Sequence, residues 1–207
     1  MDIAEVPLGR REKRTQEIRS RIEEAAYRLF REQGIEATSI DQICVEADVA
    51  RRTFYGHFPN KHSLLGGLGI SRLYDQSEPM FRLLMNNHQA TRDRLEAMID
   101  YIESNFSDYE DIDRQLILIA PSTFAEDAER QREIGDSAIG SFVHLIAAGI
   151  EVGDVKADFS PEILAAMVVG TRNMLTISWA MNSDYPIFAN LAAARAMFDH
   201  LICKDNP

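Results

Sequence analysis

The sequence predicts an all-α protein in two parts: an N-terminal three-helix DNA-binding bundle with a helix-turn-helix, and a C-terminal helical ligand-binding and dimerisation domain. Apolar residues recur at steps of three and four along most of the 207 residues, which is the spacing of one helix face. No segment reads as a convincing strand. Residues 38–65 fit two short helices joined by a tight turn. About nine helices are expected in all.

Three segments are expected along the chain. Residues 1–14 are predicted to form a flexible basic arm, which could reach a minor groove or remain a solvated tail. Residues 15–62 would form the helix-turn-helix DNA-binding domain, and residues 63–207 the ligand-binding and dimerisation domain.

The net charge of −11 argues against DNA binding by the chain as a whole. The acidic excess lies in the C-terminal part, however, whereas positive charge is clustered at Arg10–Arg14 and at Arg51-Arg52. We expect phosphates to repel the acidic part, which would orient the N-terminal domain toward DNA.

The first helix of the motif is predicted to start at Ser39, where Ser39 and Gln42 form a capping-box pattern. A turn at Asp48 leads to a second helix from about Arg51 to His57. In a helix-turn-helix, this second helix enters the major groove and its N-terminal residues meet base edges.

Arg51 and Arg52 stand at the N-terminus of that second helix, and arginine pairs bidentately with O6 and N7 of guanine. Thr53 can offer a methyl group to thymine or a hydroxyl to a base. Polar residues elsewhere in the motif would contact phosphates. The alternative, a three-helix core with incidental surface arginines, fits the two arginines alone but not the whole motif. The predicted DNA-binding residues are Thr38, Ser39, Arg51, Arg52, Thr53, Tyr55, His57 and Lys61.

The same block resembles the N-terminal DNA-binding domain of the TetR family of one-component transcriptional regulators. That family has a Thr-rich start to the first helix of the motif, an Ala-Gly-Val-Ser turn, a short helix ending Tyr-x-His-Phe, and a lysine at the next helix. The matching positions here are Thr38-Ser39, Ala47-Asp48-Val49-Ala50, Tyr55-Gly56-His57-Phe58 and Lys61. The resemblance implies a homodimeric regulator, with repression as the expected mode, that binds a pseudo-palindromic DNA operator and is released by a small, largely apolar effector.

Three positions depart from the family pattern. Asp48 replaces the turn glycine, and Asp adopts left-handed backbone conformations less easily than Gly. Ala50 replaces a serine cap, and Arg52 stands where glycine is common. These differences bear on which bases are read rather than on the fold.

A heptad seam after Pro161 predicts a dimer interface. Its apolar positions step by 4, 3, 4, 3 and 4 residues, with a small residue in the middle. A second apolar face on the same helix, which includes Leu164 and Val168, could pack inward while the seam packs against a partner; an intramolecular core seam is the alternative. The predicted interface residues are Ile163, Met167, Gly170, Met174, Ile177, Met181, Leu191 and Phe198.

The family resemblance also implies an effector pocket in the C-terminal domain. Each candidate lining residue is more often a core residue than a ligand contact. Arg172 lies in an apolar helix and needs a carboxylate, a carbonyl or an acidic ligand as its partner. The candidate lining residues are Met98, Tyr101, Ile102, Phe106, Phe142, His144, Arg172 and Trp179.

Two rival functions remain. An enzyme is disfavoured because the sequence holds no His-Glu-x-x-His, Gly-x-Ser-x-Gly or P-loop motif, and neither catalytic residues, metal ligands nor a cofactor is predicted. A ligand-independent DNA-binding or architectural protein stays open. The longest uncharged apolar run, residues 163–170, is too short for a membrane span, so we expect a cytoplasmic protein with no membrane partner.

Overall fold

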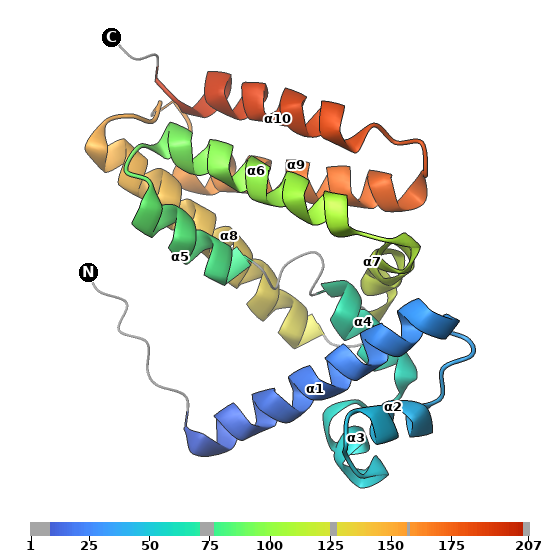
Figure 1. The fold of residues 1–207 in the computed structure, drawn as a ribbon. Helices are drawn as coiled ribbons and strands as arrows, with labels where there is room; N and C mark the ends of the chain where they lie inside the picture. Colours follow the sequence, from blue (N-terminus) through green and yellow to red (C-terminus); the bar gives the residue numbers. More distant parts are fainter. Residues whose placement is uncertain (1–8, 71–76, 125–127, 157, 205–207) are drawn as a thin grey trace. The chain divides into compact units, whose positions relative to one another are not determined.

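A computed structural model of the chain describes residues 9–70, 77–124, 128–156 and 158–204. The all-α prediction is confirmed, and over the described ranges the β contact is limited to one isolated bridge between Val155 and Cys203. Within those ranges there are ten helices (Figure 1): α1 (Arg10–Gln33), α2 (Ile40–Glu46), α3 (Arg51–His57), α4 (Lys61–Ile70), α5 (Ser77–Asn87), α6 (Thr91–Asp108), α7 (Asp111–Phe124), α8 (Ala128–Val152), α9 (Pro161–Met181) and α10 (Ile187–Ile202).

The additional helix relative to the sequence prediction is α5. Its apolar pattern is short, but Met80 and Leu84, one turn apart, are both buried in the core. Helix α7 also continues through Pro121, although proline commonly ends a helix. A proline removes one backbone hydrogen bond, and Pro121 lies in the last turn, so the rest of α7 is unaffected.

The chain divides into two compact units, Met1–Leu68 and Gly69–Pro207. The division falls inside α4, a few residues after the predicted boundary at 62–63. In the first unit, Ile22, Ala26 and Phe30 follow one another at four-residue steps on α1 and are all buried. Phe54 of α3 and Phe58 pack into the same core. These contacts hold the short α2 and α3 helices, which are too short to be stable alone.

The expected flexible arm is wrong for residues 10–14, because α1 begins at Arg10. The start of this helix is stabilised by Glu12, whose carboxylate accepts a hydrogen bond of 2.8 Å from the N–H of Gly9. The basic run therefore forms the exposed first turns of α1. Residues 1–8 of the predicted arm lie outside the described residues.

The turn between α2 and α3 has the backbone that the sequence suggests. Asp48 has a φ of 50°, in the left-handed region that glycine most often occupies. The N–H of Val49 then donates to the carbonyl of Cys44 over 3.0 Å, which closes the turn. Ala50 begins α3 without a side-chain cap, as expected for a residue that replaces serine.

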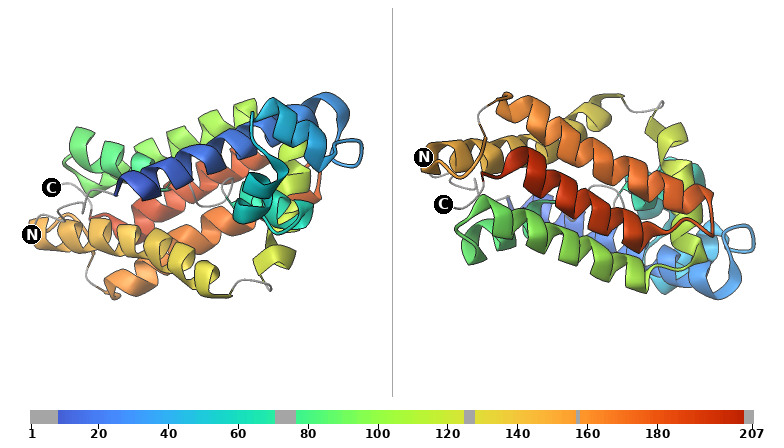
Figure 2. Two further views of the ribbon diagram at one scale, coloured as in Figure 1. Left: turned by 90° about the horizontal axis from the view of Figure 1, so that it is seen from below. Right: turned by 90° about the horizontal axis from the view of Figure 1, so that it is seen from above.

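The second unit is a layered helical bundle. Seen from above, α10 lies between α6 and α9 (Figure 2), and it packs against both. Helix α8 packs along α9, and α5 packs against α6 and α8. The core that they enclose is apolar and includes Met98, Phe142 and Phe198. This bundle fixes the positions of the side chains that line a pocket between α6 and α9.

Candidate functional site

Helix α3 buries one face and exposes the other. Phe54 is fully buried and stacks edge-to-face with the ring of Tyr55 at 5.5 Å between centroids. Tyr55 is itself 51% exposed, and the predicted base-reading residues Arg51 and Arg52 are exposed as well. The buried phenylalanine thus anchors a short helix whose outer face carries two cations and a phenol. This is the arrangement that a recognition helix requires.

The remaining predicted residues of α3 are half-buried. Thr53 lies at the edge of the exposed face. Burial, aided by the nearby charge of Arg19, lowers the pKa of His57. His57 is therefore in its neutral form at pH 7, where its ring can accept or donate a hydrogen bond but brings no positive charge to a phosphate.

An ion pair at the start of α3 is a feature that the sequence analysis misses. The guanidinium of Arg51 donates from Nε to Oδ1 and from Nη2 to Oδ2 of Asp41, a residue of α2. The hydrogen bonds from Arg51 lower the pKa of the Asp41 carboxyl. The two residues are ten positions apart across the turn, so no helix periodicity relates them. The turn geometry alone brings them together.

Thr38 and Lys61 face inward, contrary to their prediction as DNA contacts. Thr38 is 2% exposed, and its hydroxyl donates to the carbonyl of Gly34 over 2.8 Å. The ammonium of Lys61 donates to the carbonyls of Thr38, over 2.7 Å, and of Ile35. Because backbone carbonyls use these donors, the structure gives both side chains a bracing role between α1, the following loop and α4.

Ser39 remains at the surface as the N-cap of α2. Its hydroxyl accepts a hydrogen bond from the N–H of Gln42 over 3.2 Å, and the Gln42 side chain accepts from the N–H of Ser39 over 2.8 Å. The predicted capping box is therefore formed. A phosphate contact by Ser39 stays a prediction.

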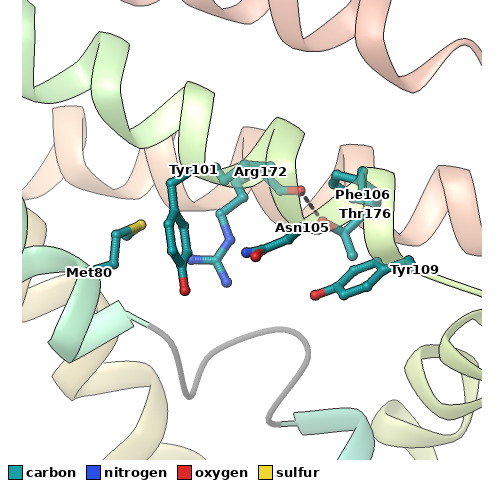
Figure 3. A pocket seen from close by; sticks show the side chains of 8 residues that line it. Met80, Tyr101, Asn105, Phe106, Tyr109, Arg172 and Thr176 are labelled. Carbon is teal, nitrogen blue, oxygen red and sulfur yellow. Dashed lines mark hydrogen bonds between the residues drawn. The ribbon is translucent and has the colours of Figure 1, made fainter.

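A pocket in the second unit lies between α5, α6 and α9 (Figure 3) and has room of about 30 Å³ for water-sized molecules. That space is far smaller than a typical small-molecule site, so a ligand of ordinary size would have to widen the pocket. In the view of Figure 3 the hydroxyl of Tyr101 and the guanidinium of Arg172 both point downward, and the amide of Asn105 points sideways toward that guanidinium. The lining residues are Met80, Tyr101, Ile102, Asn105, Phe106, Tyr109, Arg172 and Thr176.

Four predicted lining residues, Tyr101, Ile102, Phe106 and Arg172, are brought together in this pocket. Four others are not. Met98 and Phe142 are core residues with almost no exposed surface. His144 is exposed on α8, and Trp179 lies behind the pocket wall.

Helix geometry could have found three of the lining residues that the sequence analysis misses. Asn105 and Tyr109 continue the face of Tyr101 at four-residue steps along and just beyond α6, and Thr176 follows Arg172 one turn later on α9. Met80 could not have been found in this way, because it comes from the unpredicted α5. Apart from Met98 and Ile102, the predicted residues are aromatic or basic, whereas the pocket is defined by which helix faces meet.

An aromatic cluster supports one wall of the pocket. The ring of Trp179 contacts those of Phe106 and Tyr109, with centroid distances of 5.1 and 5.7 Å. The guanidinium of Arg114 lies 3.8 Å from the centre of the Trp179 ring and donates to the carbonyl of Asn182 over 3.1 Å. The wall that a ligand would touch is thereby tied to α7 and to the end of α9.

The heptad seam of α9 faces out of the unit. Met174 is 62% exposed and Ile163, Gly170 and Met181 are exposed too, while Met167 and Ile177 are half-buried. A Cβ added to Gly170 would have no atom within 4 Å. The opposite face of α9 is buried in the core, including Leu164 and Val168.

Leu191 and Phe198 do not belong to the predicted partner-facing surface. Each is 1% exposed and packs in the core of its own unit, because α10 turns this face toward α6 and α9. Two large apolar residues of α10 are exposed instead: Phe188 near its start, at 50%, and Leu201 near its end, at 41%.

By length and composition alone, α9 could cross a membrane, with a mean hydropathy of 1.3 over an 18-residue window. The prediction that no segment is long enough to span a membrane considered only uncharged runs of residues, and it therefore missed this helix. A core helix of a soluble protein passes the same test. One face of α9 is in the core here, and Arg172 interrupts its apolar sequence.

Among the described residues, no cluster of three or more His, Cys, Asp or Glu side chains could hold a metal ion. Cys44 and Cys203 are both buried free thiols. Burial raises the pKa of Cys203 to about 11.

Residues 22–68 match the family model described as bacterial regulatory proteins, tetR family. An HTH-type transcriptional regulator of Staphylococcus aureus is 31% identical over 90 residues, which are 44% of this chain and 48% of the relative. The match thus spans about half the length of that curated relative.

Solved structures extend the likeness in fold to most of the chain. A TetR-family transcriptional regulator from Pectobacterium atrosepticum has a TM-score of 0.64 at 19% identity, covering 96% of this chain and all of the other. Thermus thermophilus FadR, a TetR-family repressor in complex with lauroyl-CoA, has a TM-score of 0.61 at 22% identity, covering 91% of this chain and 97% of the other. Residues 22–68 therefore belong to the tetR family of bacterial regulatory proteins, and most of the chain shares the fold of solved TetR-family regulators.

Proposed function

We propose that this protein is a dimeric transcriptional repressor that binds a pseudo-palindromic operator and leaves it when a small ligand occupies the second unit. The observation that carries the proposal is the exposed face of α3, where Arg51, Arg52 and Tyr55 project from a helix anchored by Phe54. Arginines at the start of such a helix suit guanine edges. Tyr55 would contact the phosphate backbone, which sets register rather than sequence.

Dimerisation is supported by the outward seam of α9. Exposed Met, Ile and Gly residues along one helix face form an apolar surface that a monomer seldom leaves in water. A two-fold axis beside α9 would pair this surface with itself. Two recognition helices would then meet successive major grooves of one operator.

The effector is proposed to be an apolar or aromatic molecule with an acidic group. Phe106, Tyr109 and Met80 supply apolar lining, and Arg172 is the charged residue of that lining. Thermus thermophilus FadR binds lauroyl-CoA, a molecule that also joins an apolar part to anionic groups. The pocket has room of only about 30 Å³ for water-sized molecules, so a ligand would have to widen it, and one smaller than an acyl-CoA is proposed. The protein would act in the cytoplasm without a membrane partner.

Selection of bound sequences from random DNA tests the DNA-binding part. The expected winner is a pseudo-palindrome with half-sites about one helical turn apart. Arg52→Ala should relax base preference at one position, whereas Tyr55→Phe should weaken all sequences alike. An equal loss on operator and random DNA for Arg52→Ala would contradict base reading by that residue of α3.

Ligand response is tested by release. Aromatic carboxylic acids and medium-chain fatty acids would be titrated into the protein–operator complex and anisotropy of labelled DNA followed. An active compound should lose its effect with Arg172→Met, while Arg82→Met, a cation of α5 that is not part of the pocket lining, should respond normally. Release by none of these acids, with intact operator binding, would favour a ligand-independent DNA-binding protein.

A further inference from the structure

The Arg51–Asp41 ion pair lies on the face of the first unit that is proposed to meet DNA. The side chain of Arg51 is 66% exposed and that of Asp41 54% exposed. An exposed ion pair of this kind adds little to folding stability. A stabilising role therefore does not account for an acidic residue beside the first residue of a recognition helix, where its charge would repel phosphates.

The pair leaves the base-reading edge of the arginine available. A guanidinium has five N–H donors. Asp41 takes the donors on the side edge, from Nε and from one position of Nη2. Two parallel donors, one on Nη1 and one on Nη2, remain on the outer edge. Two parallel donors of this kind match O6 and N7 of guanine.

We propose that Asp41 is a positioning residue for sequence recognition: it holds the guanidinium of Arg51 by one edge so that the outer edge reads a guanine in the major groove. The inference rests on the proposed function, because it assigns a role within operator binding.

The physical gain is in orientation. A free arginine side chain loses rotamer entropy when it is fixed on a base. Two hydrogen bonds to one carboxylate restrict it before DNA arrives, so less ordering remains for the specific complex. The carboxylate also opposes the electrostatic attraction that drives binding to any sequence. Both effects widen the gap between operator and random DNA.

The opposite role would be sequestration, in which Asp41 keeps Arg51 from DNA. The two roles differ in sign. If Asp41 positions Arg51, its loss weakens discrimination at a guanine. If Asp41 withholds Arg51, its loss strengthens that discrimination.

The experiment compares the full-length wild type with Asp41→Asn, which keeps the shape of the side chain but removes its charge. An operator taken from selection on the wild type would carry 7-deazaguanine at each guanine in turn, which removes the N7 acceptor. We expect one guanine per half-site at which this change weakens wild-type binding by about five-fold or more. In Asp41→Asn the fold loss of affinity caused by 7-deazaguanine should fall toward one, meaning no loss. The affinity of this variant for random DNA should rise.

Two further variants separate position from charge. Glu36→Gln also removes one exposed negative charge from the first unit, but Glu36 is not part of the ion pair. It should raise affinity for random DNA and keep the full 7-deazaguanine penalty. In an Arg51→Ala background the penalty should already be gone, and adding Asp41→Asn should change nothing further. Thermal unfolding would verify that each variant is folded.

A full or larger 7-deazaguanine penalty in Asp41→Asn would overturn the inference, and a larger one would show sequestration. Failure of the proposed function would give a different result, because the wild type would then enrich no sequence from random DNA. In that case the positioning role would be excluded as well.

Discussion

At the residue scale, the helix-turn-helix shows that a cation of the motif need not project from the surface. Arg51 and Arg52 project outward, whereas the ammonium of Lys61 is turned onto two backbone carbonyls of its own unit. Sequence position identified all three as DNA contacts. The difference arises from the loop after α1, whose carbonyls at positions 35 and 38 lack helical partners and lie within reach of the lysine.

Lys61→Met should therefore destabilise the first unit. The substitution keeps an apolar stem but leaves the carbonyls of Ile35 and Thr38 without these donors, which costs roughly 1–3 kcal/mol for buried groups. Denaturation in urea would measure the loss. Lys13→Met, on the exposed first turns of α1, should leave the midpoint unchanged. Unchanged stability together with a uniform loss of DNA affinity would instead make Lys61 a phosphate contact.

Cys203 should make stability depend on alkaline pH. Burial raises its pKa to about 11, above the value of about 8.5 in an unfolded chain. The folded state therefore binds this proton more tightly. Its stabilising effect is complete below about pH 8 and declines as pH rises through 9 to 11. Urea midpoints measured across that range should fall less steeply for Cys203→Ala, and an identical slope would exclude the thiol as the cause.

At the element scale, the glycines of α4 have different surroundings, although nothing in the sequence distinguishes one from another. A Cβ on Gly69 would lie 2.1 Å from the carbonyl oxygen of Leu116 on α7. A Cβ on Gly67 would come no closer than 3.1 Å, and the atom it meets there is the end of the flexible Arg19 side chain. Gly69 thus permits close packing of two helices, whereas Gly67 has room for a methyl group.

Gly69→Ala should lower the melting temperature of the protein, because α4 and α7 must separate to admit the methyl group. Overpacking of this kind costs about 1–3 kcal/mol. Gly67→Ala is the matched control, since the gain in helix propensity of up to about 1 kcal/mol offsets a mild contact. Calorimetry of both variants would decide, and equal melting temperatures would contradict close packing at Gly69.

The sequence predicted helices where long apolar periodicity or a cap was present. The capping box at Ser39 and the left-handed turn at Asp48 are local features, so local sequence sufficed for them. Helix α5 was missed because its apolar pattern is short. Half of the residues that line the pocket were predicted. The rest were missed because the packing of the bundle decides which faces of α6 and α9 meet. Likewise, Asp41 and Arg51 meet only through the geometry of the turn.

At the scale of the whole molecule, α9 has two apolar faces with different environments. Leu164, Val168 and Trp179 are buried within the unit. Ile163, Met174 and Met181 lie on the other side, exposed. A helix that is apolar all round needs a partner on each side. The bundle provides one partner, and a second copy of the chain is the proposed other.

Met174→Asp should separate the proposed dimer. Met174 is in the middle of the exposed seam, next to the open position at Gly170, so a two-fold axis there would bring two new carboxylates together in an apolar interface. Burying an unpaired charge in this way is strongly unfavourable. Sedimentation at micromolar concentration should show a dimer for the wild type and a monomer for the variant.

Leu83→Asp is the matched control, because Leu83 is a similarly exposed apolar residue of the same unit, on α5 and away from the seam. It should sediment as the wild type does. Operator affinity should fall with Met174→Asp, since a monomer engages only one half-site and loses the gain in effective concentration that the second recognition helix provides. A wild type that sediments as a monomer, or a Met174→Asp variant that remains a dimer, would place the interface elsewhere than on α9.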